Sequence, residues 1–392
     1  MEKGGRPRKV SPLHARLAAQ GCVHSETFGW ERPKWFSLDG RAEQYSYSRN
    51  NVFDVVRGEV AALHERVGVL DLSGFAKYDI SGPDSEAFLN RICANRVPRK
   101  PGGIALVHLL SAGGRIQGEM TITRLEGDRF YALSAAAAEL RDRDLLLQSL
   151  ASGERVQIDN VSESRGVLVV SGPRARDLLS LLTDANLGNA AFPWLRGREI
   201  PILGESVRAL RVSYVGELGW ELHPPIESLP ALYDAVWDCG RKLGIANYGL
   251  YAVNSLRLEK AYKAWSSELT NELNMLEADM ARFIRFDKPD FAGKAATLGA
   301  APRPYKIVYA EVAATDTDAR GGEPVLVADR CIGVVTSGAY GHRVRKSLAF
   351  ACVDPQFAAA GSRFELLIQG ERCGATVLGA AAFDPENARM RV

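Results

Sequence analysis

Alternating apolar and polar positions predict short strands, and two of them are followed by the same kind of segment. Lys77–Ser81 (KYDIS) alternates like a strand and ends at Gly82-Pro83, after which Asp84–Ile92 has the spacing of an amphipathic helix. Val167–Ser171 (VLVVS) reads as a buried strand and is again followed by Gly-Pro, then by a helical stretch over Ala175–Leu182. This unit occurs twice, about 90 residues apart. An internal duplication and chance use of common turn chemistry both explain it.

The rest of the chain alternates between both kinds of element, which predicts α+β domains. Residues 302 onward change to short β-rich runs between Gly-containing turns, typical of a small all-β module. Ala300–Pro304 is the expected linker to that module. The other predicted strands are Met120–Leu125, Arg129–Ser134, Tyr305–Val312, Pro324–Val327 and Gly333–Thr336, and the other predicted helices are Ala137–Leu150 and Leu229–Leu243.

Length and composition indicate an ordinary globular protein. A chain of 392 residues is expected to form two or three domains, and 46% hydrophobic with 24% charged residues gives no reason to expect disorder. The 49 basic and 47 acidic residues leave a formal charge of +2, which provides no electrostatic attraction for nucleic acid or membranes. No apolar run approaches the roughly 20 residues of a membrane span, and no signal-peptide core follows the basic first residues. We therefore expect a soluble, cytoplasmic protein.

Several common kinds of site are absent from the sequence. The six cysteines form no C-x-x-C pair and the six histidines form no H-E-x-x-H, so free, mostly buried thiols and no metal are expected. The chain also lacks a helix-opening G-x-G-x-x-G, a G-x-x-x-x-G-K-[ST] loop and a G-x-S-x-G elbow. Dinucleotide enzymes, P-loop enzymes and α/β-hydrolases are disfavoured.

Three segments could carry chemistry. In Ser213–Leu222 the turn around Gly216 is flanked by Tyr214, Glu217 and Glu221, and a pocket carboxylate there could accept two parallel N–H bonds. Composition alone favours an ordinary hairpin with solvated acids. Gly113–Thr121 places Glu119, a possible general base, at a strand start beside a Gly-Gly turn.

The third segment contains Arg257 and Glu259. We expect these two side chains to form a structural ion pair between domains.

In order and spacing, five motifs resemble the aminomethyltransferase family, whose best-known member is the glycine cleavage system T protein. The motifs are Val67–Ser73 (VGVLDLS), Ile80–Asp84 (ISGPD), Tyr214–Glu221 (YVGELGWE), Ser255–Glu259 (SLRLE) and Gly333–Ser337 (GVVTS). Trp30–Phe36 (WERPKWF) and Leu256–Trp265 (LRLEKAYKAW) look like the folate-binding half of dimethylglycine and sarcosine dehydrogenases. Only 29 residues precede Trp30, so the chain resembles that half working without its own flavin domain, as in free-standing folate-dependent demethylases.

The resemblance implies a three-domain ring with tetrahydrofolate in the central channel. We expect an N-terminal segment (residues 1–55) packed on the folate-binding core, α+β folate-binding domains at 56–165 and 166–300, and a β-barrel at 301–392. Carried over residue by residue, Glu221 would hold the pterin edge and Tyr214 would line the pocket, acting with Glu119 in catalysis. Thr121 would lie at the polar rim of the pocket. Trp265 and Arg257 would be further folate contacts.

Five positions depart from the family pattern: Glu119, Val253, Asn254, Met275 and Asp279. Glu119 stands where the family has a catalytic aspartate, so its carboxylate is displaced by roughly 1–1.5 Å, comparable with misplacements that cost ~10²-fold in rate. We expect the carboxylate function to be retained. Val253 stands where the glycine-cleavage branch has an arginine for the folate tail, so tail binding must differ.

The expected function is one-carbon transfer, methyl or methylene, with tetrahydrofolate as the acceptor from a small N-, O- or S-methyl donor. A separate flavin-dependent oxidase is a possible partner. The alternatives are glycine-cleavage aminomethyl transfer, a non-catalytic folate-binding subunit, and an iron–sulfur assembly factor of the same fold. Leu258–Trp265 lacks the "KGCYxGQE" pattern of those assembly factors.

Overall fold

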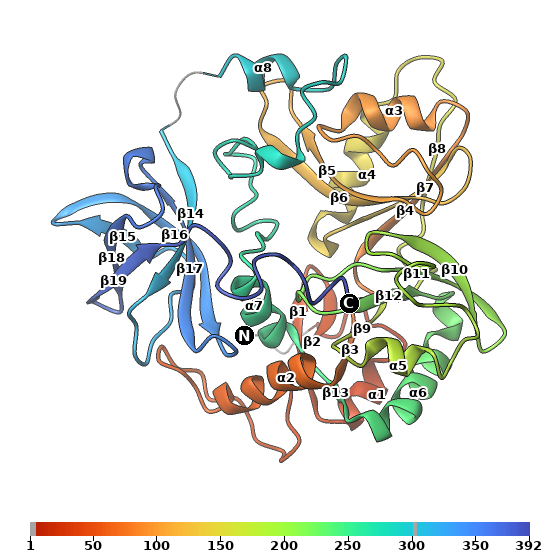
Figure 1. Ribbon diagram of the computed structural model, residues 1–392, viewed down its shortest axis with the longest axis horizontal. Helices are drawn as coiled ribbons and strands as arrows, with labels where there is room; N and C mark the ends of the chain where they lie inside the picture. Colours follow the sequence, from red (N-terminus) through yellow and green to blue (C-terminus); the bar gives the residue numbers. More distant parts are fainter. Residues whose placement is uncertain (1–4, 301–303) are drawn as a thin grey trace.

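Three bodies surround the helix α7 (Leu250–Glu259) in the computed structural model, which describes residues 5–300 and 304–392 (Figure 1). One body is built on a five-stranded sheet, one on a six-stranded sheet and one on a closed six-stranded barrel. This arrangement confirms the predicted α+β ring with a C-terminal β-barrel. In the described part of the chain, no helix is both long and apolar enough to cross a membrane.

The first body is a sheet in the order β5-β6-β7-β4-β8 with helices on one face. Phe88 and Leu89 of α3 and Leu146 of α4 pack on its apolar side chains. The predicted elements are confirmed, with α4 starting later because a 3₁₀ turn, Ala136–Ala138, comes first. The elements are β4 (Ala76–Ser81), α3 (Ser85–Ile92), β5 (Ile104–Leu110), β6 (Ile116–Arg124), β7 (Arg129–Ser134), α4 (Glu139–Gln148) and β8 (Gln157–Asn160).

The second body is a sheet in the order β10-β11-β12-β9-β3-β13. The predicted helix after β9 ends early, at Leu179, and the predicted Leu229–Leu243 helix finishes as a 3₁₀ turn. Leu178 of α5 and Val236 of α6 pack against Trp220 in its largest apolar cluster. The elements are β3 (Val67–Asp71), β9 (Leu168–Ser171), α5 (Ala175–Leu179), β10 (Gly197–Ile202), β11 (Glu205–Leu210), β12 (Gly219–His223), α6 (Leu229–Gly240) and β13 (Ile245–Asn247).

The two sheets repeat one topology and exchange one strand each. The order β5-β6-β7-β4-β8 corresponds position by position to β10-β11-β12-β9-β3. β8 precedes β9 in the chain but pairs with β4, where Gln157 faces Ser81. β3 precedes β4 but pairs with β9, where Gly68 faces Ser171. Because matching strands occupy matching places, this topology supports internal duplication over chance.

Because of the strand exchange, the boundary between the first two bodies differs from the predicted domain boundary. The sequence places residues 56–165 in one domain, yet β3 lies in the sheet of the second body. Helix α2 (Phe53–Glu65), which precedes β3 in the chain, also packs on the second body, because its Val60 and Leu63 share an apolar cluster with Val169. The strand with which β3 pairs lies far away in the sequence. The local sequence of β3 therefore does not show which sheet it joins.

The N-terminal segment packs on the second body. Leu13, Leu17 and Phe36 belong to the cluster beneath the six-stranded sheet. Of this segment, residues 1–4 lie outside the described range. The elements are α1 (His14–Ala19), β1 (Cys22–Thr27) and β2 (Trp30–Phe36).

The third body is a barrel in the order β14-β17-β16-β15-β18-β19. The three predicted strands are present, the last starting earlier than expected, at Arg330. Of the predicted linker Ala300–Pro304, residues 301–303 lie outside the described range. The elements are β14 (Lys306–Val312), β15 (Pro324–Val327), β16 (Arg330–Gly341), β17 (Lys346–Val353), β18 (Arg363–Ile368) and β19 (Glu371–Val377), preceded by the short helix α8 (Lys294–Leu298).

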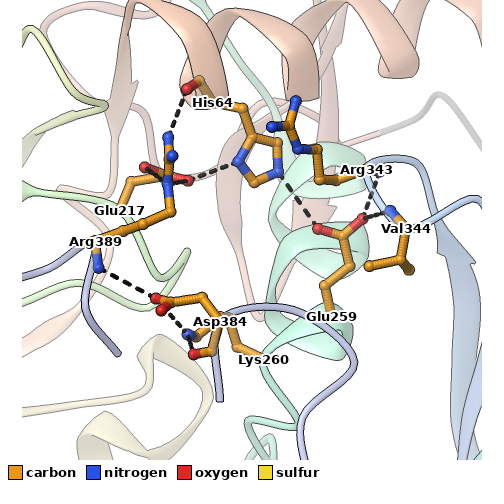
Figure 2. A network of polar contacts seen from close by, with 8 residues as sticks. All are labelled: His64, Glu217, Glu259, Lys260, Arg343, Val344, Asp384 and Arg389. Carbon is orange, nitrogen blue, oxygen red and sulfur yellow. Dashed lines mark hydrogen bonds and ion pairs between the residues drawn. The ribbon is translucent and has the colours of Figure 1, made fainter. Parts of the chain in front are cut away.

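A buried group of charges, which we call the clasp, joins the bodies at the end of α2 (Figure 2). His64 Nδ1 lies 2.6 Å from Glu217 Oε1, and His64 Nε2 lies 3.4 Å from Glu259 Oε2. Arg389 donates to both oxygens of Glu217 at 2.7 and 2.8 Å. His64, Glu217 and Glu259 are at most 4% exposed. Glu217 is therefore not the solvated hairpin acid that composition favours.

The clasp also includes the barrel and the segment after it. Glu259 accepts a hydrogen bond from the main-chain N–H of Arg343, in the hairpin between β16 and β17. Lys260 donates to the carboxylate of Asp384 at 3.0 Å and also to its main-chain oxygen. Residues 384–389 thus connect the barrel to α2, α7 and the loop before β12 (Figure 2).

We predict that Gly82→Ala destabilises the protein far more than Gly153→Ala. Both glycines have positive φ, +121° and +84°, but a Cβ at Gly82 would lie 2.2 Å from the main-chain oxygen of Arg155, whereas nothing lies within 4 Å of one at Gly153. We expect a loss of about 3 kcal/mol at Gly82 against about 1 kcal/mol at Gly153. Scanning calorimetry of both variants measures the difference, and equal losses would contradict the packing at this turn.

We predict that the clasp weakens as pH rises. Burial alone would lower the pKa of His64, but hydrogen bonds to Glu217 and Glu259 outweigh burial and raise it. A raised folded-state pKa stabilises the protein fully below the unfolded value, about 6.5, and this contribution is lost as pH rises through the folded value. Each unit of raised pKa corresponds to about 1.4 kcal/mol.

His64→Asn should therefore remove part of the fall in stability as pH rises above about 6.5, measured by thermal unfolding. His24→Asn is the matched control, because burial lowers the pKa of His24 to about 4 and its imidazole does not titrate in this window. A wild-type pH slope that survives in His64→Asn would rule out His64 as its source.

Candidate functional site

Two acidic side chains lie on the sheet faces that the helices leave uncovered. In β6, Met120 and Ile122 point into the cluster beneath α3 and α4, so Glu119 lies on the opposite face. In β12, Trp220 belongs to the cluster beneath α5 and α6, so Glu221 lies on the opposite face. Strand alternation thus turns both acids away from the helical layers.

Those two uncovered faces meet. Tyr131 and Leu133 of the first sheet form one apolar cluster with Leu210 of the second sheet. Thr121 is the ladder partner of Leu133, and Glu221 is the ladder partner of Leu210. The structure therefore brings Thr121 and Glu221 to the same interface between the first two bodies.

Glu119 is held by a histidine on the neighbouring strand. His108 of β5 faces Glu119 in the ladder, and His108 Nε2 lies 2.8 Å from Glu119 Oε2. The imidazole is fully buried, whereas 21% of the Glu119 side chain is exposed. The carboxylate is thus fixed on its protein side and open on the other.

Glu221 has a buried histidine of its own. His223 Nε2 lies 3.3 Å from Glu221 Oε2, and His223 Nδ1 lies 3.1 Å from the hydroxyl of Tyr131 in the first body. Burial lowers the pKa of His223, although Glu221 opposes that shift. Glu221 is only 15% exposed and is not a solvated hairpin acid. A relay of polar groups therefore crosses from one sheet to the other behind this carboxylate.

Tyr214 is close enough to Glu119 for the charge of that carboxylate to affect its hydroxyl. Its hydroxyl donates to the main-chain oxygen of Lys263 at 3.0 Å, and its ring stacks on Tyr262 with centroids 6.1 Å apart. The residue is 42% exposed. Desolvation raises the pKa of Tyr214, and the charge of Glu119 raises it further. Glu119 and Tyr214 thus belong to one polar environment.

The two other predicted folate contacts, Trp265 and Arg257, differ in how many hydrogen bonds they already make within the protein. The ring of Trp265 lies under the guanidinium of Arg141, 4.4 Å from its centroid, at the first body. Arg257 donates to the carboxylate of Glu268 at 3.2 Å, to the hydroxyl of Ser337 in the barrel at 2.9 Å, and to two further oxygens. Arg257 is therefore engaged in joining α7 to the barrel.

The predicted ion pair between Arg257 and Glu259 is wrong. Arg257 pairs with Glu268, and Glu259 pairs with His64. Residues two apart on an α-helix point to different sides, so they cannot face each other. The cross-body connection that we expected exists, but with other partners.

Two buried polar side chains, His108 and Tyr248, lie near the acids. Among the described residues, His108 Nδ1 has no hydrogen bond, whereas the Tyr248 hydroxyl has Ser171 as a partner. Burial raises the pKa of Tyr248, and the charge of Glu221 adds to that rise. A buried unpaired polar group costs about 1–3 kcal/mol. Both side chains are fully buried, so neither polar group is open to a ligand.

Sequence reasoning missed the two histidines and Tyr131. The histidines are scattered and have no metal-ligand spacing, so they attract no attention as a set. Strand alternation was the available signal, because His223 lies two residues after Glu221 on one strand face. His108 could be found only once the β5–β6 register was known.

Cysteines form no second site in the described residues. All six thiols are free, as expected, but only Cys22 and Cys93 are buried and Cys331 is exposed. The expectation of mostly buried thiols therefore holds only in part. No group of three His, Cys, Asp or Glu side chains within residues 5–300 and 304–392 is arranged to hold a metal.

Comparison with known proteins places the whole chain in one family. The family profile described as "GCVT N-terminal domain" matches residues 13–288, and "Glycine cleavage T-protein C-terminal barrel domain" matches residues 306–384. Mitochondrial dimethylglycine dehydrogenase of Rattus norvegicus is 38% identical over 395 residues, covering 99% of this chain and 46% of that protein. A 4-methylaminobutanoate oxidase (formaldehyde-forming) of Paenarthrobacter nicotinovorans is 32% identical, covering 100% of this chain and 48% of that protein.

The chain thus spans about half the length of these relatives. The fold agrees with a solved structure of glycine cleavage system aminomethyltransferase T from Bartonella henselae, with a TM-score of 0.84 at 22% identity, over 96% of this chain and 99% of that one. Profile, relatives and fold agree, and the chain belongs to the glycine cleavage T-protein family.

Proposed function

We propose that this chain transfers a one-carbon unit from a small N-methyl amine to tetrahydrofolate. The observation that carries the proposal is the pair of carboxylates, Glu119 and Glu221, each held by a buried histidine on a sheet face turned to the same body-to-body interface. The sequence alone leaves N-, O- and S-methyl donors open. The names of the relatives, dimethylglycine dehydrogenase and 4-methylaminobutanoate oxidase, favour an N-methyl donor.

Glu221 is the proposed anchor of the pterin ring. Tetrahydrofolate would supply the nitrogen nucleophile that accepts the one-carbon unit. Each oxygen of a carboxylate can accept two hydrogen bonds, so the contact of Glu221 with His223 leaves both oxygens able to accept a parallel pair of hydrogen bonds from the pterin edge. Tyr214 would line the pocket.

Glu119 is the proposed proton acceptor of the transfer. Its exposed oxygen can take a proton from the reacting group, which contributes typically 10²–10⁴-fold in rate. Thr121, two residues further along the same strand face, would mark the polar rim. Trp265 and Arg257 stay predictions as folate contacts, and Trp265 is the better candidate because the donors of Arg257 already have protein partners.

An oxidant is needed if the carbon passes at the oxidation level of formaldehyde. Converting an N-methyl group to that level removes two electrons, which a flavin-dependent oxidase acting on the same donor would accept. Sarcosine oxidase subunit alpha of Rhizobium meliloti is 29% identical over 98% of this chain, covering 40% of that subunit, so we propose such an oxidase as a partner. Cytoplasmic location stays a prediction.

We predict that Glu221→Gln weakens tetrahydrofolate binding by about 10–100-fold, because an amide replaces one charged acceptor with a donor. Calorimetric titration of tetrahydrofolate measures the change. Glu205→Gln is the matched control, since Glu205 is an exposed acid on the adjacent strand β11 and its loss should leave affinity unchanged. A wild-type chain that does not bind tetrahydrofolate would reject the proposed function, whereas unchanged affinity in Glu221→Gln would reject only the assigned anchor.

We predict that Glu119→Gln lowers the turnover of one-carbon transfer by about 10²–10⁴-fold without changing tetrahydrofolate affinity. Formaldehyde serves as the one-carbon probe, and its tetrahydrofolate-dependent consumption is measured above the uncatalysed rate. Glu119→Asp keeps the charge but shortens the side chain by one methylene, so it should fall between wild type and Glu119→Gln. Equal turnover in all three proteins would remove Glu119 from the mechanism.

A further inference from the structure

His108 is held more rigidly than the carboxylate it contacts. It lies in the middle of the β5–β6 ladder, fully buried, and its main-chain oxygen accepts a hydrogen bond from Ala94. Its ring is 5.8 Å from that of Phe283. Glu119 is part-exposed, and its Oε1 has no hydrogen-bond partner among the described residues. Within residues 5–300 and 304–392, the one hydrogen bond to this carboxylate therefore comes from a rigid, buried donor.

The surroundings of His108 decide which ring nitrogen carries hydrogen. Nδ1 is buried and has no partner in the described part of the chain. Hydrogen on Nδ1 alone would leave a buried donor unpaired and would set the lone pair of Nε2 against a carboxylate oxygen at 2.8 Å. Hydrogen on Nε2 instead makes a charge-assisted bond to Glu119. The geometry therefore selects the tautomer with Nε2–H.

The hydrogen bond from His108 compensates for the greater length of Glu119 relative to the family's aspartate. A glutamate has one more rotatable bond, so an unsupported carboxylate would sample several positions. The bond from His108 fixes Oε2 and leaves Oε1 as the oxygen that faces the open side. A misplacement of 1 Å in such a group can cost ~10²-fold in rate, so fixing the longer side chain matters for turnover.

We propose that His108 is a positioning residue for Glu119: it donates from Nε2 to one carboxylate oxygen so that the other is presented to the reacting group. This inference rests on the proposed function, because it concerns the acid proposed to accept the proton. The corresponding contact of His223 with Glu221 is longer, at 3.3 Å, and supports the carboxylate proposed to bind rather than to react. His108 should therefore affect turnover and leave tetrahydrofolate affinity unchanged.

The test compares His108→Leu with His108→Gln. Glutamine can place an amide N–H close to the position of Nε2, whereas leucine removes the donor. We expect His108→Leu to lower kcat for the formaldehyde probe by about 10²-fold, with tetrahydrofolate affinity unchanged, and His108→Gln to restore most of that loss. Thr123→Val is the matched control, because Thr123 is buried on the same face of β6, its hydroxyl is unpaired among the described residues, and its loss should leave kcat unchanged.

A second measurement does not depend on activity. In ¹⁵N-histidine spectra, the resonances missing from His108→Gln identify His108 among the six histidines. We expect a protonated Nε2 and a bare Nδ1, and we expect Glu119→Ala to move the Nε2 signal of His108 alone.

The outcomes separate the two proposals. Hydrogen on Nδ1 alone, or a His108 signal that is insensitive to Glu119→Ala, would overturn the inference even if His108→Leu does not fold. A folded His108→Leu with wild-type kcat, or equal losses in the leucine and glutamine variants, would overturn it as well. Failure of the wild-type chain to bind tetrahydrofolate would instead reject the proposed function, whatever the spectra show.

Discussion

The pairing of β3 with β9 and of β8 with β4 determines how the first two bodies meet. β3 precedes β4 in the chain but lies in the second sheet, and β8 ends the first sheet just before β9 begins in the second, so the chain passes between the two sheets twice. Helices cover one face of each sheet, so the uncovered faces are left to meet each other. Glu119 and Glu221 lie on those faces because they occupy the alternate positions of β6 and β12. The site is thus a consequence of strand exchange combined with the two-residue period of a strand.

Buried charge is handled the same way in three places. His64, His108 and His223 are each almost completely buried, and each contacts a glutamate. Isolated buried charges are costly, so a paired carboxylate is retained where its position matters. In the clasp, both partners are buried and the group joins the bodies. At the other two places the glutamate keeps part of its surface open, and the same pairing fixes one oxygen of the carboxylate.

The local hydrophobic pattern predicts most helices and strands, but it does not predict which of them pair or pack together. The alternation in Lys77–Ser81 and the Gly-Pro turn after it predict β4 and α3 correctly, because these depend on neighbours in sequence. The assignment of β3 to the second sheet depends on a strand about 100 residues away and leaves no local trace. Arg257 shows the same limit: its spacing to Glu259 suggested a pair, yet its actual partners, Glu268 and Ser337, lie in a loop and in the barrel.

The two acids of the site are expected to differ in role because their surroundings differ. Glu221 is the less exposed and is backed by a relay that reaches Tyr131 in the other sheet. Such an environment suits fixed recognition, because every group behind the carboxylate is already placed. Glu119 has one held oxygen and one open oxygen and influences the hydroxyl of Tyr214. A carboxylate that exchanges a proton needs that open side, so we expect binding at Glu221 and proton transfer at Glu119 because their exposure and hydrogen-bond partners differ.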